Sequence, residues 1–87
     1  MMANVVYIVK IGTLSKVTSM FNLYNYYYSS LKKANKMKDE VLRDNLAKNV
    51  RDSFTGKMYG SMVSSIDYEG EDGKYTGRIL IEKEVVW

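Results

Sequence analysis

The sequence contains no cysteine, no histidine and no proline among its 87 residues. Without cysteine the chain has no disulfide and no thiolate, which excludes the small secreted proteins whose folds depend on disulfide bonds. Without histidine it lacks the usual general base at neutral pH and the commonest zinc ligand. These absences remove most routes to nucleophilic or metal-assisted catalysis, so we expect no enzymatic activity, no cofactor and no metal.

Long hydrophobic runs are also missing. The apolar run at 5–9 is too short for the core of a signal peptide, and no basic segment precedes it. No segment approaches the roughly 20 apolar residues that a membrane-spanning helix needs. We therefore expect a cytoplasmic protein without a membrane partner.

What is present is the composition of one small globular domain. Hydrophobic residues make up 46% of the chain and charged residues 26%, which is typical of a folded protein. A chain of this length buries only about 60% of the surface that it exposes when unfolded, so the core is thin. We interpret residues 1–87 as a single domain.

The amino-acid usage also carries a hint of origin. Lysine, asparagine and tyrosine are frequent, and lysine far outnumbers arginine. AT-rich codons encode this usage, which is typical of low-GC bacteria and of their phages and plasmids. A phage or mobile-element protein would act in the cytoplasm of its host.

The two ends of the chain predict strands. Residues 5–12 (VVYIVKIG) are β-branched and aromatic, which favours a central strand. Near the other end, Asp72-Gly73 is typical of a type I′ hairpin turn. The turn predicts strands at 60–69 and 75–86.

The register of this hairpin follows from the turn. A two-residue turn at 72–73 places Ile66 opposite Ile79 on one face and Asp67 opposite Arg78 on the other. Apolar pairs and opposite charges therefore agree in one register.

The middle of the chain, 16–55, favours helix. Apolar residues recur there with a 4-3-4-3 spacing, which is typical of one face of a helix. They are Met20, Tyr24, Tyr27, Leu31 and Ala34. A second apolar stripe begins near Val41 in another register, so we expect two helices that meet near 35–38, the second ending at Gly56. The alternative is a strand at 20–28, because its aromatic residues have high β propensity.

Together these segments predict an α+β domain with the order β-α-(α)-β-β. Its helices would pack on one face of a three-stranded, mostly antiparallel sheet.

A tyrosine cluster followed by lysines is the most unusual feature of the sequence. Tyrosine offers a large contact area at low rotamer cost, and exposed tyrosines often mark interfaces. On a helix, Tyr24, Tyr27 and Tyr28 would share one side and Tyr26 would point elsewhere; part of the cluster would then belong to the core. The candidate partner-binding residues are Tyr24, Tyr26, Tyr28, Lys32, Lys33 and Lys36.

These residues support three hypotheses. The first is a non-enzymatic binding module that inhibits or modulates a larger protein. The second is a nucleic-acid-binding protein, because lysines beside aromatic rings suit single strands and the net charge of +3 permits it. The third is a self-associating structural protein such as a homodimer, because oligomerisation is a common remedy for a thin core.

Overall fold

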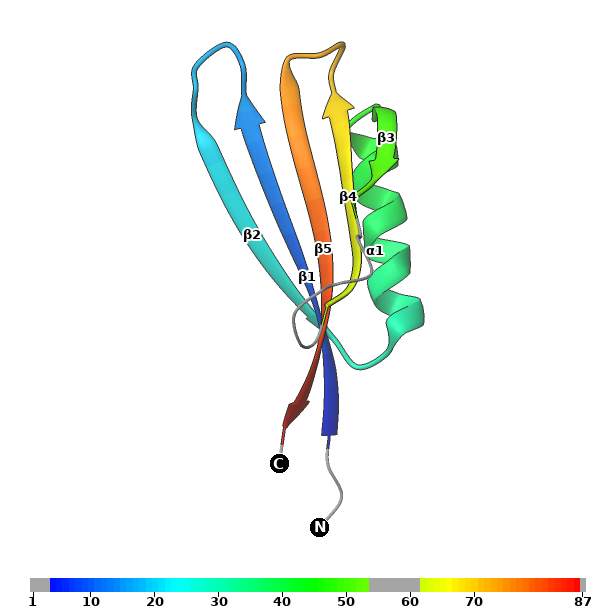
Figure 1. Ribbon diagram of the computed structural model, residues 1–87. Helices are drawn as coiled ribbons and strands as arrows, with labels where there is room; N and C mark the ends of the chain where they lie inside the picture. The colour runs from blue at the N-terminus through cyan, green and yellow to red at the C-terminus, as the bar shows by residue number, and fades with distance from the viewer. Residues whose placement is uncertain (1–3, 54–61, 87) are drawn as a thin grey trace.

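The computed structural model describes residues 4–53 and 62–86, and residues 1–3, 54–61 and 87 lie outside the description. The described residues form five strands and one helix (Figure 1). In chain order these are β1 (Asn4–Ser15), β2 (Phe21–Tyr28), α1 (Leu31–Asp44), β3 (Lys48–Asp52), β4 (Met62–Gly70) and β5 (Tyr75–Val86).

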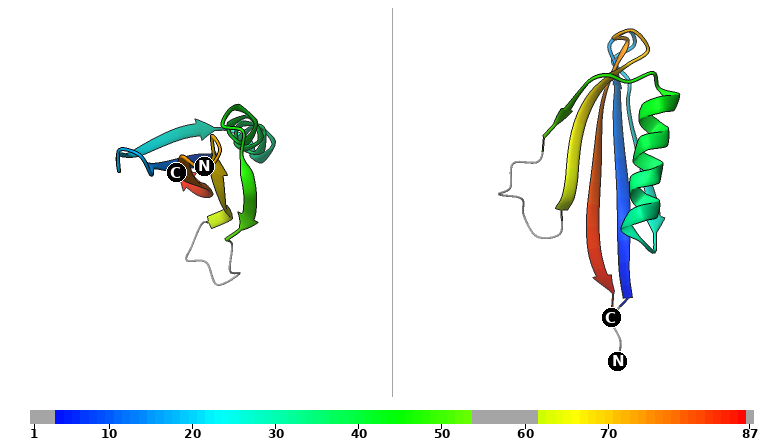
Figure 2. Two further views of the ribbon diagram at one scale, coloured as in Figure 1. Left: turned by 90° about the horizontal axis from the view of Figure 1, so that it is seen from above. Right: turned by 90° about the vertical axis from the view of Figure 1, so that its right-hand side faces the viewer.

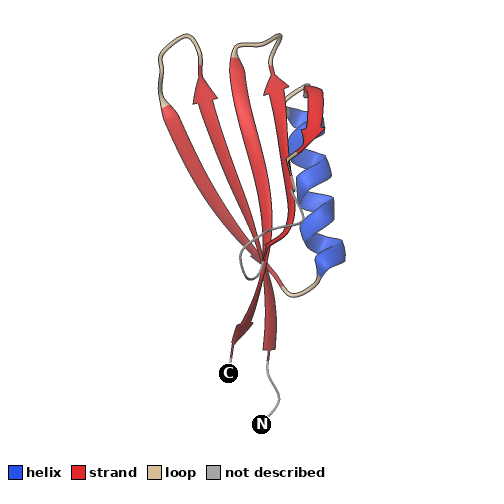
Figure 3. Ribbon diagram, in the orientation of Figure 1, coloured by secondary structure: helices blue, strands red, loops and turns tan. Residues whose placement is uncertain are grey.

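All five strands belong to one antiparallel sheet with the order β2-β1-β5-β4-β3 (Figure 3). Its centre is the pairing of the two longest strands, β1 and β5, which extends from Asn4 opposite Val86 to Ser15 opposite Tyr75. Alternate residues of these strands face the same side and form the core. The most deeply buried are Val9, Ile11, Ile79 and Ile81, which are at most 4% exposed.

The helix covers this side of the sheet. Ser30 caps its first turn, because the Ser30 side chain accepts a hydrogen bond from the Lys33 N–H at 3.2 Å. Ala34 is fully buried in the same cluster as the central strands, since its small side chain lets the helix approach closely. Figure 2 shows α1 on one side of the curved sheet. Within the described residues no helix covers the other face.

The predicted three-stranded sheet with two helices is wrong. Residues 21–28 are a strand, β2, which pairs with β1 from Leu14 opposite Phe21 to Tyr7 opposite Tyr28. A tight turn joins the two strands. The Ser15 hydroxyl stabilises this turn because it accepts hydrogen bonds from the backbone N–H groups of Val17 and Thr18. Local pairing with an adjacent strand therefore outweighed the helical spacing, and the strand alternative is confirmed.

The helical segment is also placed differently. Leu31 and Ala34 do belong to a helix, but α1 continues through 35–38, where a break was predicted. It ends at Asp44 with Asn45 as the C-cap, and Leu46 then has a positive φ of 50°. The region expected to form the second helix contains β3, and Gly56 lies outside the described residues.

The strands predicted at the two ends are confirmed where they are described. β4 and β5 pair in the predicted register, with Ile66 opposite Ile79 and Asp67 opposite Arg78. Asp72 and Gly73 have the positive φ values that a type I′ turn requires, 56° and 86°, and Glu71 before them also has a positive φ of 47°. Of the predicted strand at 60–69, residues 62–69 belong to β4, and residues 60 and 61 lie outside the description.

One close contact fixes the packing of β4 on β5. Tyr68 lies directly opposite Gly77, and its ring occupies the space that a Cβ atom at Gly77 would fill. Tyr68 is 3% exposed, and burial raises the pKa of its hydroxyl. A glycine at position 77 is therefore what allows this ring into the core.

We expect the substitution Gly77→Ala to lower the free energy of unfolding by about 1–3 kcal/mol, because the Tyr68 ring must leave its position. Urea denaturation followed by circular dichroism measures the change. Gly12→Ala is the matched control, because a Cβ there meets the Phe21 ring at 3.4 Å, an ordinary contact distance. Its expected effect is within about 0.5 kcal/mol. Equal effects of the two substitutions would contradict the packing role of Gly77.

Candidate protein-interaction surface

Exposed apolar side chains gather on β2 and on the turn that precedes it. Twelve large hydrophobic side chains are exposed among the described residues, and eight of them lie between positions 14 and 27. They are Leu14, Val17, Met20, Phe21, Leu23, Tyr24, Tyr26 and Tyr27. A concentration of this kind exceeds the ordinary scatter of apolar side chains on a surface, which makes this part of the molecule a candidate interaction site.

The position of β2 explains this exposure. It is an edge strand, and seven of its eight residues are exposed. Alternate side chains point to opposite faces. Phe21, Leu23 and Tyr27 therefore lie on the open face, away from α1, and are 62%, 61% and 65% exposed.

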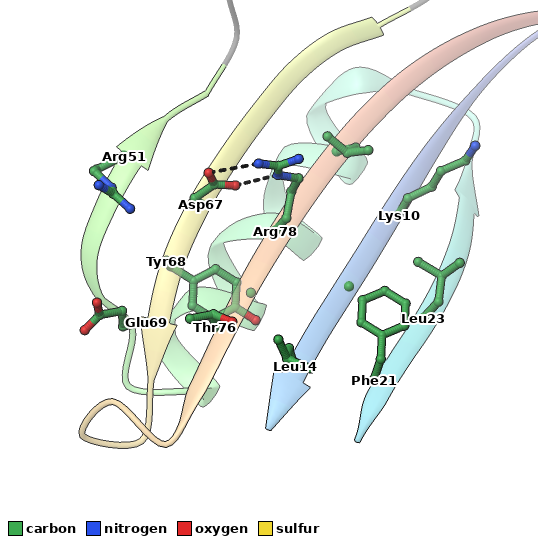
Figure 4. Close-up of a pocket in the computed structure, with 13 residues that line it drawn as sticks. Lys10, Leu14, Phe21, Leu23, Arg51, Asp67, Tyr68, Glu69, Thr76 and Arg78 are labelled. Carbon is green, nitrogen blue, oxygen red and sulfur yellow. Dashed lines mark hydrogen bonds and ion pairs between the residues drawn. The ribbon is translucent and has the colours of Figure 1, made fainter. Parts of the chain in front are cut away.

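On the open face, the curved sheet forms a groove with a volume of about 600 Å³. Figure 4 shows its two ends. Leu14, Phe21 and Leu23 come from the β1–β2 hairpin and make one end apolar. The other end carries charged side chains from β5, β4 and β3. These are Arg51, Asp67, Glu69 and Arg78.

The main charges of this face are paired. Arg78 holds Asp67 with two hydrogen bonds, from Nε to Oδ1 at 2.6 Å and from Nη2 to Oδ2 at 3.2 Å. The hydrogen bonds from Arg78 hold the pKa of Asp67 below its usual value, and the charges of Arg78 and Arg51 act in the same direction. Lys10 forms a second ion pair with Glu82 at 3.0 Å. The face thus offers apolar contact area beside two ion pairs, with Arg51 and Glu69 as further charged side chains of the groove.

The three predicted tyrosines come together, although not on a helix. Tyr24, Tyr26 and Tyr28 lie on the helix side of β2, because they are opposite Ile11, Val9 and Tyr7. Tyr24 is 48% and Tyr26 39% exposed, whereas Tyr28 packs against the core. The expectation that Tyr26 points away from Tyr24 and Tyr28 is wrong, since a strand groups every second residue. Tyr27 is the one on the opposite face.

The three predicted lysines are exposed in the first two turns of α1. Lys32, Lys33 and Lys36 lie on the solvent side of the helix, opposite the side that Ala34 buries. They share the helix side of the molecule with the three tyrosines. That they form one binding surface with those rings stays a prediction.

The open-face residues Phe21 and Leu23 were not among the binding residues predicted from the sequence. One signal could have found them: no charged residue occurs between Lys16 and Lys32. An uncharged segment rich in aromatic residues is too apolar on both faces for an ordinary solvent-exposed edge strand.

No group of three or more aspartate, glutamate, cysteine or histidine residues in the described part of the chain is arranged to hold a metal ion. None of the helical structure described is both long and apolar enough to cross a membrane.

Comparison with protein-family models, with curated proteins and with solved structures found no match.

We expect Arg78→Gln to raise the pKa of Asp67 toward its usual value of 3.8, because the largest cause of the lowering is removed. A carboxylate whose pKa is lowered in the folded state stabilises the fold above its unfolded pKa. This stabilisation is lost as the pH falls through the pKa that Asp67 has in the folded state. At neutral pH we expect the free energy of unfolding of the variant to fall by less than about 1 kcal/mol, because exposed ion pairs of this kind are weak.

An NMR titration of the Asp67 side chain, with unfolding measured at neutral and at acid pH, checks this expectation. Arg43→Gln is the control, because Arg43 lies 3.9 Å from Asp44 on the exposed side of the helix. It leaves the titration of Asp67 unchanged. An Asp67 pKa that does not rise in Arg78→Gln would show that the pair is not maintained in solution.

Proposed function

We propose that this protein is a non-enzymatic binding module that engages a larger protein through the open face of its sheet. The exposure of Phe21 and Leu23 at the apolar end of the groove is the observation that carries this proposal. Large apolar side chains that are more than half exposed gain favourable free energy when a partner covers them, at about 25 cal/mol per Å² removed from water. Aromatic and aliphatic anchors of this kind supply most of the binding energy in protein interfaces.

A protein partner suits this face better than a nucleic acid does. Single-stranded nucleic acids bind where aromatic rings lie beside unpaired cations that contact the phosphates. Here Lys10 and Arg78 are already paired with carboxylates, and Glu69 adds a negative charge to the groove. Lys32, Lys33 and Lys36 lie on the other side of the molecule.

Its proposed action is stoichiometric inhibition or modulation of a host enzyme or complex. Two features of the chain support this reading. The chain carries a large apolar contact area on a small scaffold, and it lacks the histidine and cysteine on which most catalytic sites rely. Its AT-rich amino-acid usage suits a phage or mobile-element accessory protein in the cytoplasm of its host.

Affinity capture from a host lysate, with and without nuclease, followed by mass spectrometry, tests the proposal. We expect a protein partner that survives nuclease treatment. The double substitution Phe21→Ser and Leu23→Ser weakens its binding by about 30-fold, because the loss of apolar anchors costs about 2 kcal/mol. Leu46→Ser is the matched control, since Leu46 is 67% exposed but lies outside the groove. Equal binding by the double variant would refute the open-face site.

The surface on the helix side is tested in the same assay. Reversal of the charges of Lys32, Lys33 and Lys36, combined with Tyr26→Ala, leaves capture intact if the open face binds the partner. If capture instead requires the four residues and disappears with nuclease, the partner is a nucleic acid. Its affinity would then fall with salt, with a log–log slope near one per phosphate contacted.

A further inference from the structure

The two edges of the sheet are built in opposite ways. β3 is a short edge with three charged residues, Lys48, Arg51 and Asp52, an interrupted register with β4 and a positive φ of 52° at Asn49. Short length, charge and irregular register are the devices that prevent edge strands from pairing with other chains. β2 has none of them. It is eight residues long and uncharged, and it pairs with β1 without a register shift.

The direction of the backbone groups of β2 follows from its hairpin. The Ser15 N–H donates to the Met20 carbonyl at 2.9 Å, and along an antiparallel ladder the residues alternate between bonding inward and pointing outward. The inward set on β2 therefore includes Tyr24 and Tyr26. The outward set, whose N–H and C=O groups point away from β1, is Phe21, Leu23, Asn25 and Tyr27.

No strand of the described chain pairs with these outward groups. Figure 1 shows β2 at the border of the sheet, diverging from α1 toward the β1–β2 turn. A regular row of backbone donors and acceptors, with exposed aromatic side chains on both faces, is a template for one further antiparallel strand.

We propose that this strand is β2 of a second copy, so that two chains pair about a two-fold axis at Asn25. The two five-stranded sheets then form one continuous ten-stranded sheet. A symmetric pairing places residues equally far from the axis opposite each other. Asn25 and its counterpart exchange their N–H and C=O groups at the centre, as the outward direction of this residue permits.

The side chains favour a second copy and this register. On the open face, Leu23 lies opposite Tyr27 of the other chain, and on the helix side Tyr24 lies opposite Tyr26. Each of these four side chains is at least 39% exposed in the single chain. An axis at Tyr24 would instead place Leu23 opposite Asn25. Because β2 carries no charge, two copies meet there without repulsion despite the net charge of +3.

The pairing extends the proposed binding surface without consuming it. Only the strand edges are covered by backbone hydrogen bonds, and the grooves of the two copies lie on the same face of the joined sheet. Phe21 and Leu23 then flank the junction in both chains. The dimer does not depend on the proposed function, and each is tested by its own measurement.

Sedimentation equilibrium of the purified full chain tests the dimer. We expect twice the 10.0 kDa mass of one chain. Asn25→Pro yields a folded monomer, because proline removes an outward N–H and leaves the hydrogen bonds to β1 in place. Should that variant not fold, Leu23→Lys combined with Tyr27→Lys serves instead, since it brings like charges together across the axis. Val50→Lys on the opposite edge is the control, and it stays dimeric.

Crosslinking provides an independent measurement, because the chain has no cysteine of its own. In the proposed register, Asn25→Cys places two thiols on residues whose Cα atoms are about 5.5 Å apart, within the range that a disulfide bridges. We expect rapid formation of a disulfide-linked dimer on mild oxidation, and slow formation for Val50→Cys. A wild-type monomer at the highest attainable concentration, or a dimer that survives both β2 variants, would overturn the proposal.

Discussion

The structure depends on the long antiparallel pairing of β1 with β5. Val9, Ile11, Ile79 and Ile81 meet across this ladder and supply the buried centre of the sheet. All other strands are added on one side or the other of this pair. One helix of 14 residues, about 21 Å long, covers one face. A five-stranded sheet presents more apolar surface than this helix can bury, and the remainder lies on β2 and on the open face.

That imbalance connects the fold to its proposed role. Near the centre, Ala34 and the glycine at 77 allow the helix and the Tyr68 ring to pack closely. Toward the β1–β2 hairpin no such cover exists in the described residues, and Phe21 and Leu23 stay more than half exposed. Two ion pairs on the open face, Lys10–Glu82 and Arg78–Asp67, neutralise part of its charge, so apolar area lies beside paired charges. Such a surface suits a protein partner, and the proposed pairing with a second copy would enlarge it.

Some predictions from the sequence succeeded because they rested on short-range geometry. The turn at Asp72-Gly73 fixes which residues of the hairpin lie opposite each other, and the structure confirms that register. The tyrosine segment failed because a 4-3 spacing and a strand alternation coexist in it. Tyr24 and Tyr27 fit one helix face equally well, yet they lie on opposite faces of β2. The deciding factor was pairing with β1, which lies outside any local pattern of 20–28.

By itself the sequence determined the central first strand, the C-terminal hairpin and the presence of tyrosine and lysine groups next to each other. Composition, turn chemistry and alternation act over a few residues, so one chain segment reveals them. Only the tertiary structure decided that the aromatic segment is an edge strand, that Phe21 and Leu23 border a groove and that Tyr24, Tyr26 and Tyr28 share a face. Those outcomes depend on which strands become neighbours and which face the one helix covers, and both are set by burial across the whole chain.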